Sequence, residues 1–231
     1  MAVKIIDLKK SVFDDNNREA DILRDELKAK GIFLLNVMSS PGSGKTTLLL
    51  ETIALLKDDL RIGVMEADID SAVDADKVAQ TGVRTIQLHT GGMCHLDAGM
   101  TRQGLEDLGA DDLVLVILEN VGNLVCPAEF DTGASKSVML LSVPEGDDKP
   151  LKYPLMFRVA DALVISKMDC LDYFDFDVEA LKERAQKLNP SIEIFELSAK
   201  TGLHMSQWTD WLRREVAAWK QTQLQSQEES I

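Results

Sequence analysis

The sequence is poor in cysteine and has no long apolar run, and each absence excludes a class of protein. Three cysteines in 231 residues are too few, and odd in number, for a disulfide framework, so we expect a reduced, cytoplasmic chain. No apolar run approaches the roughly 18–20 residues of a membrane span, and the N-terminus lacks the basic-then-apolar layout of a secretory signal. We therefore expect no membrane association.

Positive charge is also scarce in this chain. The 25 lysines and arginines face 39 acidic residues, which gives a formal net charge of -14. A surface of this sign repels phosphate backbones, so we expect no nucleic-acid partner. The apolar content of 45% is nevertheless enough for the core of one generous domain.

Short apolar runs alternate with helical patterns along most of the chain. Before them, a charged helix is expected over residues 14–30, with Ile22, Leu23 and Leu27 on its apolar stripe. The runs are apolar almost throughout, as in parallel strands covered on both faces. This alternation predicts a doubly wound α/β fold with a mostly parallel sheet and helices on both faces. Strands are expected over residues 32–38, 62–67, 85–88, 113–118, 138–143, 162–165 and 192–197, and the main helices over 45–57, 96–108, 178–188 and 204–221.

A phosphate-binding loop, Ser39-Ser-Pro-Gly-Ser-Gly-Lys-Thr46, lies between the first strand and the next helix, which predicts a P-loop NTPase fold. Its two glycines let backbone N–H groups point at phosphate oxygens, and the helix N-terminus adds positive charge. Lys45 reaches the β- and γ-phosphates, and the Thr46 hydroxyl binds Mg²⁺. Ser39 stands where the usual pattern has its first glycine. The nucleotide-binding candidates here are Gly42, Ser43, Gly44, Lys45, Thr46 and Thr47, with Lys45 also a catalytic candidate.

Carboxylates follow two of the apolar strands. Glu119 ends one strand at the position of a Walker B acid, and the acidic stretch 66–70 ends another, with Asp74 in the loop beyond it. Carboxylates at the C-terminal ends of parallel strands face the ligand crevice. We expect one of them to contact the metal and another to orient the attacking water.

Two further loops favour guanine as the base. Ser166-Lys167-Met168-Asp169 resembles the Asn-Lys-x-Asp signature of GTPases, with serine in place of asparagine, and Ser198-Ala199-Lys200 resembles their second guanine motif. An aspartate accepts two hydrogen bonds from guanine, whereas adenine offers no such donor pair. The order of these motifs favours GTP over ATP, and an ATP-dependent kinase is the alternative.

Thiol and imidazole groups suggest a transition-metal site. Cys94 and His95 precede the helix expected from residue 96, and Cys126 lies in the loop after Glu119. These ligands suit Zn²⁺ and Ni²⁺, and a helix N-terminus favours the ligating thiolate at Cys94. Three ligands leave such a site open or shared between chains. On spacing alone, both cysteines are equally compatible with small buried hydrophobic residues.

Together these residues resemble the HypB family, the hydrogenase nickel incorporation GTPases of the SIMIBI class. The resemblance spans about residues 32–202. It rests on four stretches, Ser39–Thr47, Thr90–Asp97 (TGGMCHLD), Glu119–Pro127 (ENVGNLVCP) and Glu145–Asp148 (EGDD).

The resemblance implies a slow GTPase metallochaperone that couples GTP binding and hydrolysis to nickel delivery during [NiFe]-hydrogenase maturation, with GTP, Mg²⁺ and Ni²⁺ or Zn²⁺ bound. It implies a GTP-dependent homodimer that acts on the hydrogenase large-subunit precursor. Residues 1–30 contain no cysteine or histidine, so a HypA-type metallochaperone is the expected nickel source. Residues 1–31 would then be an N-terminal helical segment, 32–220 the GTPase domain with its metal site, and 221–231 a polar tail.

The resemblance also assigns roles by position. It implies that the shared nickel or zinc site uses Cys94, His95 and Cys126, and that Lys152 approaches a nucleotide across the dimer. Two alternatives remain, a urease-maturation GTPase, which typically carries a Cys-Pro-His metal motif, and a non-hydrolysing, nucleotide-regulated metal carrier. The magnesium ligands implied are Thr46, Asp68 and Glu119, the catalytic set is Lys45, Asp68 and Asp74, and the base contacts are Lys167, Asp169, Ser198, Ala199 and Lys200.

Overall fold

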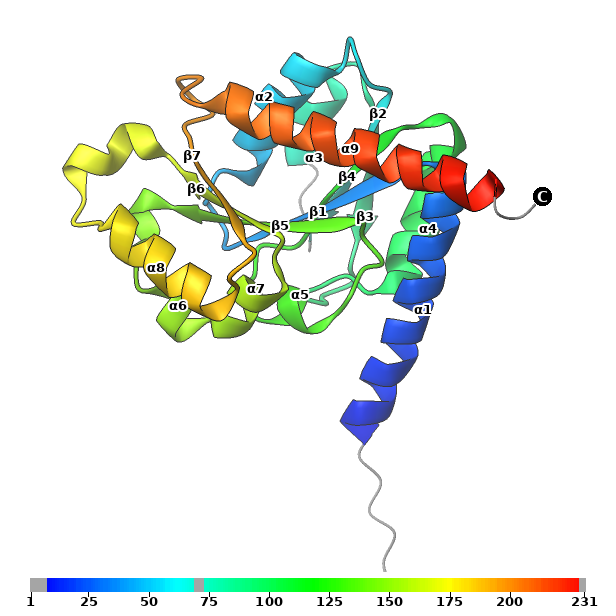
Figure 1. Ribbon diagram of the computed structural model, residues 1–231, viewed down its shortest axis with the longest axis horizontal. Helices are drawn as coiled ribbons and strands as arrows, with labels where there is room; N and C mark the ends of the chain where they lie inside the picture. Colours follow the sequence, from blue (N-terminus) through cyan, green and yellow to red (C-terminus); the bar gives the residue numbers. More distant parts are fainter. Residues whose placement is uncertain (1–7, 69–72, 229–231) are drawn as a thin grey trace, which may run out of the picture.

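A seven-stranded sheet forms the centre of the molecule (Figure 1). The computed structural model describes the backbone of residues 8–68 and 73–228, and the side chains of residues 12–67 and 75–223. Every strand pair is parallel and the order is β3-β2-β4-β1-β5-β6-β7. The predicted doubly wound α/β fold is confirmed, and the sheet is wholly parallel. The strands are β1 Phe33–Ser39, β2 Ile62–Asp68, β3 Arg84–His89, β4 Leu115–Glu119, β5 Lys136–Ser142, β6 Ala162–Ser166 and β7 Glu193–Glu196.

Helices cover both faces of the sheet. The four main helices expected after the phosphate loop are present, whereas α3, α5, α6 and α7 were not expected, because segments of four to seven residues carry too little apolar periodicity. The helices are α1 Leu8–Lys30, α2 Lys45–Leu56, α3 Val73–Ala79, α4 Ala98–Leu108, α5 Cys126–Glu129, α6 Lys149–Lys152, α7 Pro154–Val159, α8 Val178–Leu188 and α9 Met205–Glu228, with 3-10 turns η1 Ala110–Asp112, η2 Val143–Glu145 and η3 Met168–Tyr173.

One face of the sheet is covered by α2, α3 and α9, and the opposite face by α1 and α4 on one side and by α7 and α8 on the other. Figure 1 shows α2 and α9 above the sheet and α5 to α8 below it. On the upper face Trp208 is 1% exposed, stacks on Trp211 at 5.2 Å between ring centroids and donates its indole N–H to Thr52 at 2.9 Å. The core is therefore continuous above the sheet.

The lower face carries a polar interruption in β1. Side chains alternate along a strand, so Asn36 lies on the same face as Leu34 and Met38. Leu34 belongs to the apolar cluster under α1 and α4, and Met38 belongs to the cluster under α7 and α8. Asn36 is 2% exposed, donates to the Ser137 hydroxyl at 3.3 Å and accepts from the Asn120 amide at 3.1 Å. A hydrogen-bonded polar strip thus separates the two clusters.

The two terminal helices differ from expectation. α9 continues to Glu228, so the segment expected as a polar tail from residue 221 is helical up to that residue. It is held against the end of α1, where Trp219 donates to the Ile32 carbonyl and Gln223 to the Ala29 carbonyl. On α1, Ile22 is 49% exposed and only Leu23 and Leu27 of the expected stripe are buried. Among the described helices, none is both long and apolar enough for a membrane crossing.

Candidate nucleotide and metal sites

The phosphate loop connects β1 to α2 at the carboxyl edge of the sheet. Gly42 has a φ of 75° and Gly44 a φ of 104°, a left-handed conformation that glycine adopts without the penalty of a Cβ atom. The loop opens into a cavity of about 520 Å³, a volume suited to a ligand of nucleotide size. Its lining comprises Pro41, Gly42, Gly44, Lys45, Thr46, Thr47, Glu66, Ala67, Lys77, Glu119, Asn120, Val121, Gly122 and Lys167.

Ser39 has a structural role in the loop. Its side chain is fully buried, and its hydroxyl accepts from the Lys45 ammonium at 2.9 Å and contacts the Ser43 hydroxyl at 2.5 Å. Glu145 also binds the loop, because its carboxylate accepts from the Ser40 hydroxyl. The serine that departs from the usual glycine pattern therefore holds the lysine at the floor of the cavity.

Buried carboxylates form one wall of this cavity. The Thr46 hydroxyl lies 3.3 Å from a Glu119 carboxylate oxygen, so the structure brings together two of the expected magnesium ligands. Glu66 is the residue paired with Glu119 across β2 and β4, and the two acids are 3% and 4% exposed. Glu66 was not singled out, because its proximity to Glu119 depends on strand order, which the sequence does not state.

The other expected acids lie at the limit of the described structure. Asp68 is the last residue of β2 and Asp74 is in the first turn of α3. The side chains of both lie outside the described residues, and Asp70 lies outside them entirely. Their predicted contacts to magnesium and water stay predictions.

The first guanine loop is bound to the phosphate loop by two hydrogen bonds. Ser166 donates its hydroxyl to the Ser43 carbonyl at 2.6 Å, and the Lys167 ammonium donates to the Gly42 carbonyl at 2.6 Å. The serine that replaces the usual asparagine at position 166 therefore bridges the guanine loop to the phosphate loop.

Asp169 and Ser198 bring the two guanine motifs together. The Ser198 hydroxyl donates to Asp169 at 2.6 Å, and its hydrogen bond, with the nearby Lys200 charge, lowers the pKa of that carboxyl. Ser198 is 1% exposed, and the neighbouring Ala199 is half-buried. The carboxylate is thus ionised at neutral pH, the state that accepts hydrogen bonds from guanine.

We expect the Ser198→Ala substitution to raise the Asp169 pKa towards the ordinary aspartate value. A depressed pKa keeps the carboxylate charged as pH falls, so GTP affinity in the variant should begin to decline at a higher pH than in the wild type. Titration of GTP affinity between pH 3.5 and 7 measures the difference. Coincident profiles would show that Ser198 does not support the carboxylate.

Lys152 lies apart from the cavity. It is in α6, where its ammonium pairs with Asp148 at 2.5 Å, and it is not among the residues that line the phosphate-loop cavity. This chain does not itself bring Lys152 to the nucleotide site, so its predicted role depends on a second chain.

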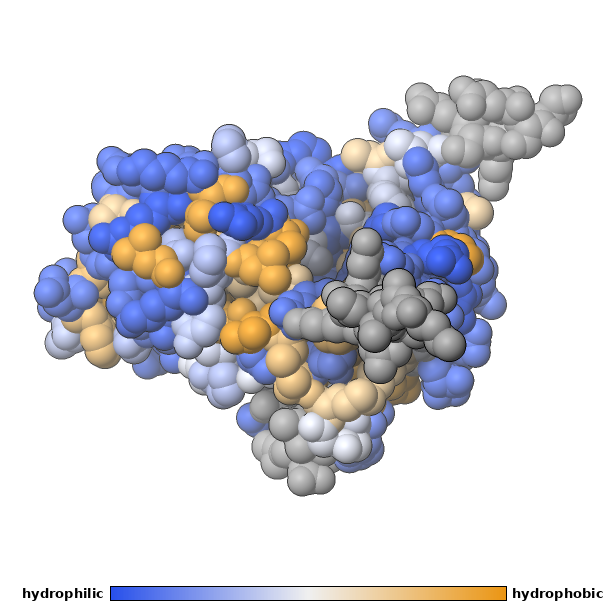
Figure 2. All heavy atoms as spheres, turned by 90° about the horizontal axis from the view of Figure 1, so that it is seen from below, coloured by the Kyte–Doolittle hydropathy of each residue, from blue (hydrophilic) through white to orange (hydrophobic). Residues whose placement is uncertain are grey.

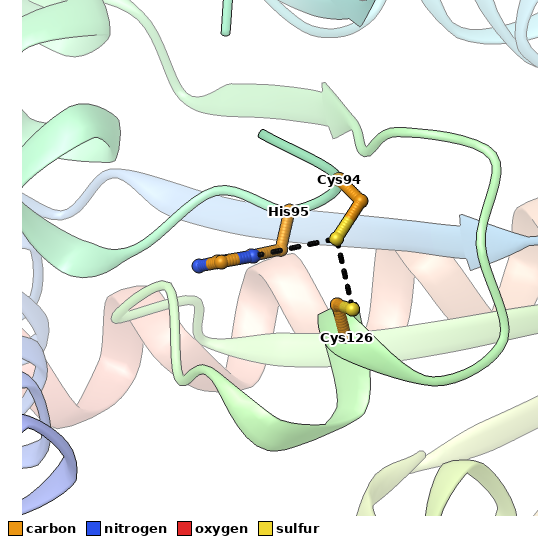
Figure 3. A group of neighbouring side chains, drawn as sticks. All are labelled: Cys94, His95 and Cys126. Carbon is orange, nitrogen blue, oxygen red and sulfur yellow. Dashed lines mark hydrogen bonds between the residues drawn. The ribbon is translucent and has the colours of Figure 1, made fainter. Parts of the chain in front are cut away.

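The two cysteines and the histidine come together from the segments that follow β3 and β4 (Figure 3). The sulfurs of Cys94 and Cys126 are 2.9 Å apart, the Cys94 sulfur is 3.9 Å from Nδ1 of His95, and all ligand atoms lie within 4.8 Å of one another. Ligands around one tetrahedral Zn²⁺ lie about 3.5 Å apart, so this donor set fits a soft divalent ion with a further position left open.

The surroundings of the cluster set its protonation. Burial lowers the pKa of His95 against the opposing effect of Asp97 and Glu129, so the ring is neutral at physiological pH, as a ligand must be. The hydrogen bond to Cys94 raises the pKa of the Cys126 thiol. The helix expected at residue 96 begins instead at Ala98, with Asp97 capping its N-terminus through the Met100 N–H. Cys94 therefore lies farther from the helix N-terminus than expected, and its thiolate stays a prediction.

A single glycine connects the nucleotide loop to the loop that carries Cys126. A Cβ atom on Gly122 would lie 3.1 Å from the backbone nitrogen and 3.1 Å from Cγ of Pro41. Backbone atoms cannot move aside as the end of a flexible side chain can.

We therefore expect Gly122→Ala to weaken GTP binding about 3- to 10-fold, the change in affinity that roughly 1 kcal/mol of strain produces. Calorimetric titration measures it, and Gly99→Ala, whose new Cβ would lie no closer than 3.5 Å to its nearest neighbours, controls for backbone stiffening.

Comparison with known proteins identifies the family. A profile described as "CobW/HypB/UreG, nucleotide-binding domain" matches residues 3–196. The chain is 46% identical over 215 residues to the hydrogenase maturation factor HypB of Escherichia coli K12. The aligned residues cover 93% of this chain and 74% of that protein. This chain belongs to the HypB family. The HypB-family GTPase recognised in the sequence is therefore confirmed, and hydrogenase maturation is the function of its relatives.

Other HypB-family relatives give the same result. The hydrogenase/urease maturation factor HypB of Helicobacter pylori J99 is 42% identical over 217 residues, 92% of this chain and 88% of that protein. A crystal structure of Helicobacter pylori HypB in complex with nickel superposes with a TM-score of 0.82 at 43% identity, covering 88% of this chain and 96% of that one. The signal recognition particle receptor FtsY of Elizabethkingia anophelis, at 15% identity and a TM-score of 0.51, shares only the fold.

Proposed function

We propose that this chain is a GTP-hydrolysing metallochaperone that binds nickel and delivers it during [NiFe]-hydrogenase maturation. One observation carries the proposal. The segment that carries Cys126 begins at the phosphate-loop cavity, because Asn120, Val121 and Gly122 line that cavity and only seven residues separate Cys126 from the cavity acid Glu119. The nickel complex of the Helicobacter pylori relative supports nickel as the cargo.

The chain's own groups suit phosphoryl transfer to water. Lys45 and the N-terminus of α2 supply positive charge at the terminal phosphates. Thr46 and Glu119 would hold Mg²⁺, which neutralises charge on the β- and γ-phosphates when bound. Asp68 or Asp74 would orient the attacking water. No arginine lines the cavity among the described residues, so turnover by the isolated chain is expected to be slow.

The metal cargo would be shared between two copies of the chain. Three ligands leave a fourth position, which the second copy would fill or share in a GTP-dependent homodimer. Apolar side chains gather on the face seen in Figure 2, the side of α5 to α7. Val125, Leu151, Leu155 and Val159 are each at least 41% exposed, and exposed apolar surface of this kind marks association sites. A dimer would also bring Lys152 near the partner's nucleotide.

The partners follow from the family. The hydrogenase large-subunit precursor would receive the nickel in the cytoplasm, and a HypA-type metallochaperone would supply it. A role in urease maturation is the second candidate, favoured by the Helicobacter pylori relatives, which are named for both enzymes. Deletion of the gene with measurement of both enzyme activities in cell extracts separates the two clients.

Nickel titration in two nucleotide states tests the coupling. We expect the nickel affinity and the thiolate-to-nickel absorption of the chain to differ between GDP and a non-hydrolysable GTP analogue, with dimer formation in one state only. Metal stoichiometry and molecular mass are measured on the same samples. Identical affinity, spectrum and mass in both states would refute the coupling of nucleotide to metal.

We expect Asp169→Asn to lower GTP affinity about 10- to 100-fold, which corresponds to the loss of a charge-assisted hydrogen bond. The asparagine amide would also face the guanine amine, donor against donor. Xanthosine triphosphate carries a carbonyl at that position, so its affinity should rise. Competition among GTP, ATP and xanthosine triphosphate measures the preference. An ATP preference in the wild-type chain would instead support the kinase alternative.

A further inference from the structure

Helix α1 contacts both segments that carry the metal ligands. The contacting residues are Phe13, Asn16, Leu23 and Arg24, which recur at helical spacing and so lie along one face. Their partners are the loop from Cys126 to Ala134 and the N-terminus of α4, just after His95. Helix α1 thus contacts the chain just after His95 and just after the short helix that begins at Cys126.

Asn16 connects the two ligand segments directly. Its side chain is 8% exposed, and it donates its amide N–H to the Asp131 carbonyl at 3.0 Å while its oxygen accepts from the Ala98 N–H at 3.0 Å. Asp131 is five residues after Cys126, and Ala98 is three residues after His95. One buried side chain therefore sets the spacing between the segments on which Cys126 and His95 lie.

An aromatic stack fixes the ring of His95. Phe130 lies parallel to that ring, with 3.7 Å between centroids and 15° between planes. Phe13 of α1 packs on Phe130 at 4.9 Å. The histidine has one stacked partner, and that partner is itself supported by the helix. The orientation of the ligand nitrogen thus depends on α1.

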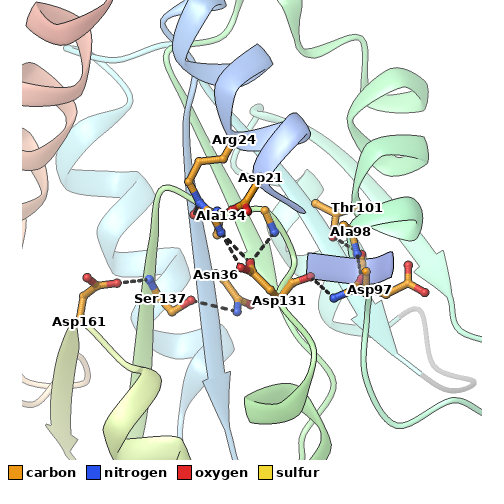
Figure 4. Close-up of polar contacts among 12 residues, drawn as sticks. Asp21, Arg24, Asn36, Asp97, Ala98, Thr101, Asp131, Ala134, Ser137 and Asp161 are labelled. Atoms are coloured by element: carbon orange, nitrogen blue, oxygen red, sulfur yellow. Dashed lines mark hydrogen bonds and ion pairs between the residues drawn. The ribbon is translucent and has the colours of Figure 1, made fainter. Parts of the chain in front are cut away.

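Further along α1, Arg24 and Leu23 hold the remainder of the loop. Arg24 contacts both carboxylate oxygens of Asp131 at 2.7 Å and donates to the Ala134 carbonyl at 3.0 Å (Figure 4). A Cβ on Gly133 would lie 2.9 Å from the Leu23 side chain, so the loop backbone lies directly against the helix. Both contacts to Asp131 come from Nη2, and charge-assisted hydrogen bonds of this kind are stronger than neutral ones.

Apolar packing fixes only part of this loop. Leu124 and Ala128 pack in the cluster of α7 and α8, and Ala134 belongs to the cluster of α1 and α4. A cavity of about 360 Å³ lies on its inner side, and its lining includes Asn36, Thr132 and Ser137. Thr132 and Asn36 are each 2% exposed, so the space is bordered by buried polar groups. The position of Cys126 therefore depends on packing against the cluster of α7 and α8 and, through residues 130–134, on the contacts to α1.

We propose that Asn16, Phe13 and Phe130 are positioning residues for the metal site, and that α1 sets the affinity of the Cys94, His95 and Cys126 cluster for Ni²⁺ and Zn²⁺. This inference rests on the proposed metal-binding function. Residues that hold metal ligands in place without binding the metal themselves typically lower metal affinity 10- to 100-fold when they are lost. The inference gives this role to α1.

The test measures Zn²⁺ affinity by chelator competition, and the Ni²⁺ absorption spectrum, on full-length variants. We expect Asn16→Ala, Phe13→Leu and Phe130→Leu each to weaken binding 10- to 100-fold. GTP affinity should stay unchanged in all three. Phe130→Tyr, which keeps the ring, should restore wild-type binding. Ile22→Ala, on the exposed side of the same helix, is the matched control and should bind as the wild type does.

A double-mutant cycle separates positioning from general destabilisation. If Phe130 acts through His95, then Phe130→Leu should weaken binding little in a His95→Ala background. Additive losses in that cycle, or wild-type affinity in all three α1 and Phe130 variants, would overturn the inference. A wild-type chain that shows no Cys126-dependent metal binding would overturn the proposed function itself, so the two failures are distinguishable.

Discussion

The Lys45→Ala variant is expected to lose about 10³-fold in kcat/KM for GTP. In the wild-type chain, the ammonium of Lys45 is the one lysine charge in the first turn of α2. It lines the phosphate cavity and donates to the Ser39 hydroxyl. Removal of one preorganised donor to developing charge typically costs 10²–10³-fold in kcat, and weaker substrate binding adds to this loss in kcat/KM. Phosphate release under single-turnover and steady-state conditions measures both parts.

Lys57→Ala is the matched control for this substitution. Lys57 follows the last turn of the same helix, is exposed, and contacts the Thr81 carbonyl at the opposite end of the sheet. It should hydrolyse GTP as the wild type does. Equal phosphate release by the Lys45→Ala and wild-type proteins would favour the alternative in which the chain is a metal carrier and nucleotide is only a structural ligand.

The Cys126→Ala variant is expected to lose more than about 100-fold in affinity for Ni²⁺ and Zn²⁺. Substitution of groups one shell beyond a metal already costs 10- to 100-fold, and this change removes a ligand itself. Its sulfur is 2.9 Å from that of Cys94, so the thiolate-to-nickel absorption should fall as well. Chelator competition and absorption spectroscopy on the same samples measure the two effects.

Cys170→Ser is the control for thiol chemistry outside the site. Cys170 is also half-buried, but its sulfur lies near Asp169 and not near the metal cluster. Its removal should leave metal binding unchanged. If Cys126→Ala also retained wild-type affinity, the metal would bind elsewhere on the acidic surface and the cluster would be no more than a pair of adjacent thiols.

The phosphate loop and the sheet were predictable because their determinants are local. The glycines, Lys45 and Thr46 lie within one loop, and near-continuous apolar runs indicate buried parallel strands whatever their order. The two guanine motifs were predicted from short local patterns in the same way, and the structure joins their residues Ser198 and Asp169 by a hydrogen bond.

The remainder depends on contacts between distant segments. Glu66 lies next to Glu119 in the carboxylate wall of the cavity because β2 is next to β4. Asn16 reaches Asp131, which is 115 residues away along the chain, and nothing in the helix sequence marks that asparagine. Sequence patterns also misplaced the start of α4 by two residues, because the capping preference of Asp97 competes with the apolar Leu96 before it.

The polar strip of Asn36 and Ser137 divides the apolar packing beneath the two segments that carry the metal ligands. Leu96, next to His95, belongs to the cluster of α1 and α4, whereas Leu124, next to the Cys126 segment, belongs to the cluster of α7 and α8. The predicted metal ligands therefore come from segments anchored in two separate apolar clusters, and the side chain of Asn16 connects these segments again.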